Sequence, residues 1–274
     1  GMNTVFIDVN EQDFQSLVDG LDLDIAFIAL HGRFGEDGTV QKALEEKNIR
    51  YTGSGPASSR LALDKWASKE KFIEKGVMTP PHVIIKKGEG VSCGDIQPPC
   101  VVKPRWEGSS IGLSIVLSSE ELSYAIDKAL EFGDEGIVEE FIPGREITVG
   151  ILGQKALPVV EIGAKEGVYD FEAKYVAGDT RYIVPAELDD DTYEEAKKLA
   201  LKAHEALGCT GFSRVDMRLS DSKKIFVLEV NTIPGLTERS LLPMAAKEAG
   251  LDFLELCVKM LYEAIDNSAK ISGR

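Results

Sequence analysis

The sequence lacks the features that mark membrane, secreted and nucleic-acid-binding proteins. No apolar run approaches the length of a membrane span, and no signal peptide is visible. Acidic side chains outnumber basic ones and the formal net charge is -15. That charge argues against a broad surface for nucleic acid or anionic lipid, although it allows a local cationic pocket. We therefore expect no nucleic-acid and no membrane partner.

Cysteine is scarce and has no spacing typical of a metal site. The four cysteines lie in mostly apolar surroundings, at Cys93, Cys100, Cys209 and Cys257. Such residues are typical of reduced core positions and predict a cytoplasmic protein. Internal repeats and low-complexity segments are also absent. With 274 residues, 43% of them hydrophobic, the chain is long enough for two or three domains.

The most informative stretch, Gly211–Ser240, contains two segments in which apolar and polar residues alternate. Within Ser213–Leu219 the apolar side chains stand mostly at odd positions. Within Phe226–Asn231 the apolar side chains at 226, 228 and 230 stand at even positions. Side chains of a strand alternate between its faces, and the polar cluster 220–224 is typical of a turn. The sequence therefore predicts a β-hairpin whose apolar face packs on helices.

The alternation also predicts the register of this hairpin. If both strands share the polar face, an even position must pair with an odd one. A turn centred near Ser222 then places Asp216 opposite Glu229 and Arg214 opposite Asn231. Directly opposed carboxylates destabilise a strand pair unless something neutralises them. Since two carboxylates and an amide oxygen suit a hard cation, the register predicts a magnesium site.

The alternation by itself favours a simpler interpretation, an amphipathic hairpin whose polar face is solvated. The turn Asn231–Gly235 favours the metal site, because it ends the strand directly after the candidate ligands. Functional residues often occur at such strand ends. The pattern does not identify a reaction.

The N-terminal residues contain two apolar stretches that predict strands, Thr4–Val9 and Ile25–Leu30. The second is apolar throughout, as expected of a strand buried on both faces in a parallel sheet. It leads into His31–Gly38, a loop dense in glycine and charge, and loops at this end of such a strand commonly bind ligands. His31 is therefore a candidate binding residue, although a turn residue that caps a helix fits the sequence equally well.

A helix is predicted at Leu61–Lys75, ahead of a domain boundary at Pro80-Pro81. It carries three lysines close together, Lys65, Lys69 and Lys71. Lysines in such a group are more typical of a solvated helix face than of a site.

The stretch Val101–Leu113 places Lys103 at the end of a predicted strand, before a loop of glycine and serine. It has neither the Walker A nor the dinucleotide-binding spacing. Such a backbone can nevertheless approach phosphates closely and offer amide and hydroxyl donors. A flexible hairpin is the alternative interpretation.

The segment Tyr169–Tyr175 is polar and aromatic and follows the strands predicted at Glu146–Leu152 and Leu157–Ile162. It is too long for a tight hairpin. Long loops inside compact domains are often lids or binding loops.

Taken together, these stretches resemble the D-alanine–D-alanine ligases of the ATP-grasp superfamily. The motifs that carry the resemblance are, in chain order, His31–Gly38, Lys103-Pro104 with Glu107–Gly112, Glu172–Tyr175, Arg214-Val215-Asp216, and Glu229–Thr232 with Pro234-Gly235. The resemblance covers nearly the whole chain. It implies an α/β fold, α+β in part: an ATP-grasp fold with an N-terminal, partly truncated Rossmann-like domain.

The resemblance implies three domains and an ADP-forming ligase that acts through an acylphosphate in cell-wall synthesis. The expected divisions are 1–57 for the truncated substrate domain, 58–135 for the small lid subdomain and 136–274 for the catalytic subdomain. ATP is expected between the last two. Relatives of this kind are commonly dimers, so a homodimer is an expected state.

Several residues receive roles toward ATP from the resemblance. They are expected to hold phosphates (Lys65, Lys103), to close a loop over them (Ser109, Ser110), to bind adenine and ribose (Glu139, Glu146), and to reach the transferring phosphate (Lys174). The resemblance implies that Asp216, Glu229 and Asn231 bind two Mg²⁺ ions, or Mn²⁺ in their place.

Other residues receive roles toward the D-alanine substrates. They are expected to stabilise the oxyanion (Arg214, the N–H of Gly235), to bind the second alanine's carboxylate (Ser240, Leu241) and to lie near the substrates (His31). Tyr175 resembles the dipeptide-forming members of the family rather than the depsipeptide-forming ones.

The chain departs from the family pattern at its start. Family members open with a strand, a glycine-rich loop whose glutamate orients the first D-alanine, and a helix, and no equivalent stands before His31. Two alternatives therefore stay open: an ATP-grasp ligase with another acyl substrate, and a non-catalytic relative that binds Mg-ATP.

Overall fold

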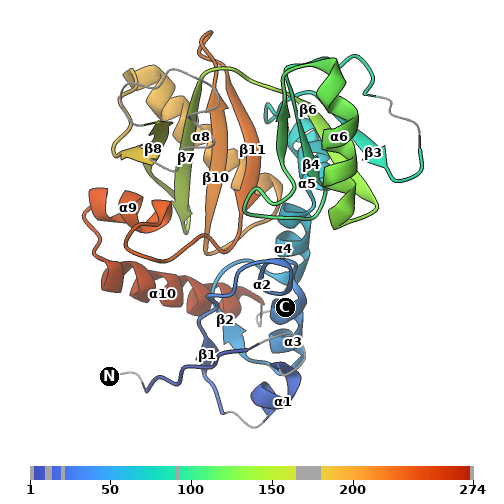
Figure 1. Cartoon of the computed structure of the whole chain (residues 1–274). Coiled ribbons are helices and arrows are strands. Elements are labelled where there is room, and N and C mark those ends of the chain that lie inside the picture. Colours follow the sequence, from blue (N-terminus) through green and yellow to red (C-terminus); the bar gives the residue numbers. More distant parts are fainter. Residues whose placement is uncertain (1–2, 10–13, 20–21, 90–92, 165–179, 272–274) are drawn as a thin grey trace.

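The structure is a computed structural model that describes residues 3–9, 14–19, 22–89, 93–164 and 180–271. Its described residues form three sheets with helices packed around them (Figure 1). A five-stranded sheet and a four-stranded sheet lie side by side, and the N-terminal residues form a separate region below both in the figure. This mixed arrangement agrees with the predicted fold class.

The two larger sheets are antiparallel, whereas the smallest pairs two strands in parallel. The five-stranded sheet has the order β11-β10-β7-β8-β9, with β7 (Arg145–Leu152), β8 (Lys155–Ala164), β9 (Thr180–Ile183), β10 (Phe212–Leu219) and β11 (Ile225–Asn231). The four-stranded sheet has the order β3-β6-β4-β5, with β3 (His82–Lys86), β4 (Cys100–Pro104), β5 (Ser114–Val116) and β6 (Glu135–Glu140). The smallest sheet consists of β1 (Ile25–Ala26) and β2 (Arg50–Tyr51).

The helices are described in two groups, those before strand β3 and those after it. The N-terminal region and the segment after it contain α1 (Phe14–Asp19), α2 (Arg33–Glu36), α3 (Thr39–Glu46), α4 (Pro56–Leu63) and α5 (Lys65–Glu74). The remaining helices are α6 (Ser119–Ala129) with a short 3-10 turn (Leu130–Phe132), α8 (Asp190–Ala206), α9 (Leu241–Glu248) and α10 (Phe253–Ile271). None of these helices combines the length and the apolar composition that a membrane span requires.

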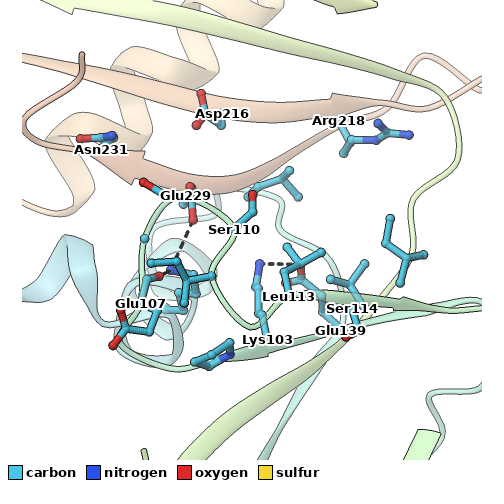
Figure 2. A pocket seen from close by; sticks show the side chains of 18 of the residues that line it. Lys103, Glu107, Ser110, Leu113, Ser114, Glu139, Asp216, Arg218, Glu229 and Asn231 are labelled. Carbon is cyan, nitrogen blue, oxygen red and sulfur yellow. Dashed lines mark hydrogen bonds and ion pairs between the residues drawn. The ribbon is translucent and has the colours of Figure 1, made fainter. Parts of the chain in front are cut away.

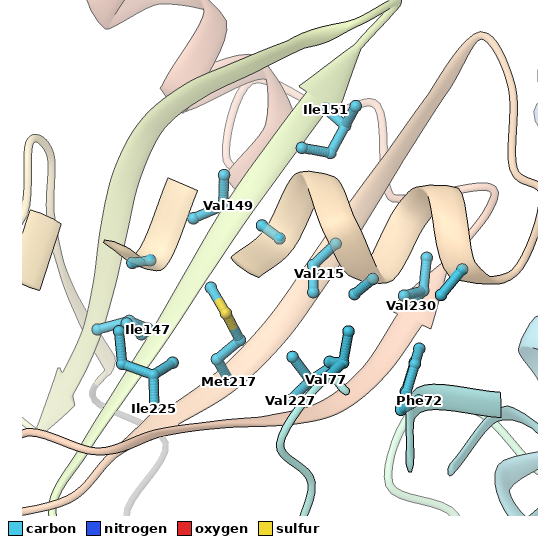
Figure 3. Close-up of a cluster of buried hydrophobic side chains, with 14 of the residues drawn as sticks. Phe72, Val77, Ile147, Val149, Ile151, Val215, Met217, Ile225, Val227 and Val230 are labelled. Carbon is cyan, nitrogen blue, oxygen red and sulfur yellow. The ribbon is translucent and has the colours of Figure 1, made fainter. Parts of the chain in front are cut away.

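The main hydrophobic core lies between the five-stranded sheet and helix α8 (Figure 3). Strand β10 contributes Val215 and Met217, which are fully buried. Helix α8 presents three buried alanines, Ala196, Ala200 and Ala203, on one face, and their small side chains let the helix lie close to the sheet. Since α8 covers the apolar face of the hairpin, the polar face is left for the cavity described below.

A β-bulge interrupts the β10–β11 ladder after the pair Asp216–Glu229. Leu228 is the extra residue and has no partner in β10. Between Leu228 and the turn, the alternation of side chains along β11 is therefore shifted by one residue. Ile225 and Val227 therefore enter the core. The prediction that the side chains at 226 and 228 enter it is wrong.

Two helices, α4 and α5, replace the single helix predicted at Leu61–Lys75. Asp64 stands between them with a ψ of 97°, and its carboxylate accepts a hydrogen bond from the N–H of Ala67 (3.1 Å) as an N-cap. The guanidinium of Arg105 pairs with the same carboxylate, with Nη2 at 2.5 Å from Oδ2. This break makes Lys65 the first residue of a helix at the side of the cavity.

The N-terminal region contains less strand than the sequence predicts. Residues 3–9 carry no strand, so the prediction at Thr4–Val9 is wrong, and Phe6 is 92% exposed. Of the stretch predicted at Ile25–Leu30 only Ile25–Ala26 pairs, with β2. The four cysteines are free, as predicted.

Candidate active site

The polar face of the β10–β11 hairpin forms one wall of a cavity (Figure 2). Asp216 pairs with Glu229 and Arg214 pairs with Asn231, so the predicted register is confirmed. Both residues of each pair line the cavity. The register holds here because these residues lie on the side of the bulge away from the turn.

Basic side chains neutralise the two opposed carboxylates. The guanidinium of Arg214 donates two hydrogen bonds to Asp216, from Nε to Oδ1 (2.8 Å) and from Nη2 to Oδ2 (2.7 Å), and this carboxylate raises the pKa of Arg214. Thr148 donates a third hydrogen bond to Asp216 Oδ1 (2.7 Å). Lys65 Nζ lies 3.5 Å from Glu229 Oε2. Desolvation would raise the pKa of Glu229, but Lys65, then Lys103 and Arg214, lower it.

The opposite wall comes from the four-stranded sheet and carries a buried ionic cluster. Lys103 Nζ donates to Glu139 Oε1 (2.6 Å), and Lys69 Nζ lies 2.9 Å from Glu139 Oε2. All three side chains are at most 6% exposed. Burial would raise the pKa of Glu139, but the two lysines lower it to about 2. Glu139 is therefore an anion between two cations.

Lys65 and Lys69 do not lie on a solvated helix face. They are 8% and 0% exposed and share the buried side of α5 with Phe72. Lys71, on another side of the helix, is 34% exposed and pairs with Glu74. The prediction that these lysines lie on a solvated helix face is therefore wrong for Lys65 and Lys69.

The glycine- and serine-containing loop after β4 lies against the cavity. Lys65 Nζ donates to the carbonyl oxygen of Glu107. Ser109 and Ser110 adopt left-handed backbone conformations, with φ of 51° and 58°. Arg33 of helix α2 holds the loop from the N-terminal region, with Nη2 at 3.2 Å from Glu107 Oε1. Three regions of the chain thus meet at this loop.

The cavity has a volume of about 1160 Å³ and gathers most of the residues predicted from the sequence. Those that line it are His31, Lys65, Lys103, Ser109, Ser110, Glu139, Glu146, Arg214, Asp216, Glu229, Asn231 and Gly235. The predicted residues Lys174 and Tyr175 lie outside the described residues.

Ser240 and Leu241 do not line the cavity within the described part of the chain. Ser240 lies beside Gly235, because a Cβ placed on Gly235 would come within 2.7 Å of Ser240 Oγ. That hydroxyl oxygen accepts a hydrogen bond from the N–H of Thr237 (3.0 Å). Leu241 packs in the hydrophobic cluster between β7, β8 and helices α9 and α10.

The structure adds residues to which the sequence assigned no role. Arg218 lines the cavity and donates to two carbonyl oxygens of the β6–β7 connection, those of Ile142 (3.0 Å) and Gly144 (2.9 Å). Its guanidinium also lies 3.7 Å from Glu146 Oε2. The sequence contained one sign of this role, because Arg218 stands four residues after Arg214 and so on the same, polar face of β10. Leu228 lines the cavity because of the bulge.

The hairpin offers oxygen donors that fit a hard cation. Two carboxylates and the side-chain amide of Asn231 lie at paired positions of one face, and Asn231 Oδ1 accepts a hydrogen bond from the N–H of Ile233 (3.0 Å), which orients it. No group of three or more His, Cys, Asp or Glu side chains suited to a metal occurs among the described residues. The donor set is thus two carboxylates plus an amide, a combination that suits Mg²⁺.

Two family models match the chain, and together they span most of it. The model described as D-ala D-ala ligase N-terminus matches residues 7–54, and the one described as D-ala D-ala ligase C-terminus matches residues 84–262. The chain is 44% identical over 254 residues to the D-alanine–D-alanine ligase of Syntrophotalea carbinolica. The matched residues are 92% of this chain and 83% of the relative. The chain is 45% identical over 276 residues to that of Geobacter sulfurreducens, covering 100% of this chain and 86% of the relative.

Solved structures give the same picture for the fold. The D-alanine–D-alanine ligase from Bacillus anthracis complexed with ATP matches with a TM-score of 0.84 and 32% identity, over 95% of this chain and 85% of that chain. The VanG D-Ala:D-Ser ligase from Enterococcus faecalis matches with a TM-score of 0.78 and 33% identity, over 89% of this chain and 74% of that chain.

Proposed function

Because the chain belongs to the D-alanine–D-alanine ligase family, we propose that it joins two D-alanine molecules to D-alanyl-D-alanine for peptidoglycan precursor synthesis, converting ATP to ADP and phosphate. The observation that carries this proposal is the 44–45% identity to ligases of that name over 92–100% of the chain. The charged cavity between two sheets agrees with it.

In the proposed reaction a carboxylate oxygen of the first D-alanine attacks the γ-phosphorus of ATP, and ADP leaves. The amine of the second D-alanine then attacks the carbonyl carbon of the acylphosphate. The resulting tetrahedral species expels phosphate, and the amine loses its proton. Both steps build negative charge on oxygen, so fixed cations and N–H donors accelerate them.

The residues of the two walls divide this work. We assign the phosphates to Lys65 and Lys103, which line the cavity from two different elements. The backbone around Ser110 would follow the phosphates, since consecutive left-handed residues like Ser109 and Ser110 can form a turn that offers N–H groups to an anion. Arg214 and the N–H of Gly235 would stabilise the oxyanion of the tetrahedral species.

Asp216, Glu229 and Asn231 would hold magnesium, for which we propose two ions, or manganese in its place. A bound divalent cation neutralises phosphate charge and orients the polyphosphate. In this structure Arg214 occupies both oxygens of Asp216. We therefore expect Arg214 to turn from Asp216 toward the substrate oxyanion when the ligands bind.

Further roles stay proposals on the strength of the resemblance. They concern adenine and ribose binding (Glu139, Glu146), the loop over the phosphates (Ser109, Ser110), the transferring phosphate (Lys174), the substrates (His31, Ser240, Leu241) and dipeptide formation (Tyr175). The divisions 1–57, 58–135 and 136–274, a homodimer and a cytoplasmic location are also proposals.

The proposal is tested by product analysis with a panel of amino acids. The protein is incubated with Mg-ATP and D-alanine, alone or with D-serine, D-lactate or L-alanine, and products are identified by mass spectrometry. We expect D-alanyl-D-alanine as the main product. D-serine is included because the VanG D-Ala:D-Ser ligase has a similar fold. A product without D-alanine at its N-terminal position, or no product with any pair, would contradict the proposal.

A further inference from the structure

Lys69 is a fully buried lysine behind the cavity rather than in its lining. Its side chain is 0% exposed, and Nζ contacts Glu139 Oε2 at 2.9 Å and Thr79 Oγ1 at 2.8 Å. Lys103 and Glu139 line the cavity, whereas Lys69 does not. Lys69 can therefore affect a ligand in the cavity only through Glu139, which it contacts.

Burying an ammonium group is unfavourable unless other groups compensate it. Replacing buried ion pairs by apolar residues is often neutral or stabilising, so stability alone is a weak reason for this lysine. Burial in fact lowers the pKa of Lys69 to about 8, against the opposing effect of Glu139. The cluster therefore keeps a cation at a position where the fold disfavours one.

The ion pairs around the cavity show what this cation changes. Lys65 pairs with Glu229, Arg214 with Asp216 and Lys103 with Glu139, so each of these pairs is neutral. Lys69 shares Glu139 with Lys103 and adds a cation without adding a carboxylate. Without Lys69, Glu139 would cancel the charge of Lys103. With it, the cluster of Lys69, Lys103 and Glu139 keeps one net positive charge.

We propose that Lys69 is a positioning residue for the nucleotide: it binds and neutralises Glu139 from behind, which leaves the charge of Lys103 available to the phosphates. The inference rests on the proposed function insofar as that function requires a nucleotide polyphosphate in this cavity. Lys69 itself touches no substrate. Its effect is on the net charge of the Lys103–Glu139 pair, whose own hydrogen bond holds Glu139 in place (Figure 2).

The test compares nucleotide ligands that differ in charge. Binding of Mg-ADP and of adenosine is measured by calorimetry for the full chain and for Lys69→Met. We expect Mg-ADP to bind about tenfold more weakly, because Glu139 then cancels the charge of Lys103 in a low-dielectric site, and adenosine binding to change less than about twofold. Lys71→Met, which replaces a partly exposed lysine on the same helix, is the matched control and should change neither.

A second comparison separates positioning from general support of the fold. In a Glu139→Gln background, Lys69→Met should cause no further loss of Mg-ADP binding, because the residue through which Lys69 acts is already neutral. In steady state, Lys69→Met should raise the KM for ATP about tenfold while kcat and the KM for D-alanine change less than about threefold.

Three results would overturn the inference. Unchanged Mg-ADP binding in Lys69→Met is one, equal weakening of ADP and adenosine is another, and additive losses in the double variant are the third. If Lys69→Met does not fold, Lys69→Gln, which removes the charge but keeps a donor, is measured in its place against the same outcomes. A wild-type protein that binds Mg-ADP but forms no dipeptide contradicts the proposed function and still permits this test.

Discussion

The two walls of the cavity differ in how firmly their charges are fixed. On the wall from the four-stranded sheet, the side chains of Lys69, Lys103 and Glu139 are 0–6% exposed and form one cluster. On the hairpin wall, the side chains of Asp216 and Glu229 are 13% and 34% exposed. Figure 2 shows the walls facing each other.

This difference indicates a division of labour. The buried cluster has a fixed geometry and an excess of positive charge, which suits a polyanion. The hairpin carboxylates are more exposed and line the cavity directly. A cation that enters between the walls can therefore compete for the hairpin carboxylates without disturbing the buried cluster.

The largest expected effect comes from weakening the hairpin wall by Glu229→Gln. A neutral amide oxygen is a poorer ligand for Mg²⁺ than a carboxylate. We expect kcat/KM for ATP to fall about a hundredfold at low Mg²⁺ and to recover partly as Mg²⁺ is raised, with the fold retained. The measurement is a magnesium titration of turnover. An unchanged magnesium dependence would remove Glu229 from the metal site.

A smaller effect is expected where the two walls are joined. Arg218 holds the carbonyl oxygens of Ile142 and Gly144 and lies close to Glu146. Arg218→Leu should loosen this connection and raise the KM for ATP about tenfold, with little change in the KM for D-alanine. Arg218→Lys keeps the charge but not the fork of donors, and should recover only part of the loss. Equal changes in both KM values would contradict a local role.

The smallest effect on activity, and a distinct effect on stability, is expected behind the hairpin. His204 is 4% exposed, its Nδ1 lies 2.7 Å from Ser213 Oγ, and burial lowers its pKa to about 4. Since the folded protein binds this proton less readily than the unfolded chain, the contribution to stability is complete above pH 6.5. It is lost progressively as the pH falls toward 4, up to about 3 kcal/mol.

His204→Gln should therefore flatten the pH dependence of stability between pH 6.5 and 4. The measurement is the free energy of unfolding from denaturant titrations at several pH values in this range. This variant tests a second difference between the walls. Behind one wall the buried side chain of Lys69 is a cation, whereas behind the hairpin the buried side chain of His204 is neutral. The same slope in the variant and the parent would contradict this assignment.

The hairpin register could be predicted because Arg214, Asp216, Glu229 and Asn231 are polar among apolar neighbours. The bulge could not, because residues 226, 227 and 228 are all apolar and fit either alternation. A single extra residue therefore moved the predicted core positions without changing the predicted site.

The burial of Lys65 and Lys69 in α5 was missed for a different reason. Lysine is so often exposed that three of them in one helix indicate a solvated face. The available signal was spacing, since Lys65, Lys69 and Phe72 fall on one stripe of the helix. What the sequence cannot supply is the partner: Glu139 comes from a strand 70 residues away from Lys69 and meets it only in the folded chain.

The most direct test of the account is phosphate release from Mg-ATP by the wild-type chain, measured with and without D-alanine. We expect release that depends on D-alanine, with one ADP and one phosphate for each D-alanyl-D-alanine formed. Release at the same rate without D-alanine, or no release with it, would contradict the claim that the two walls together form a ligase site.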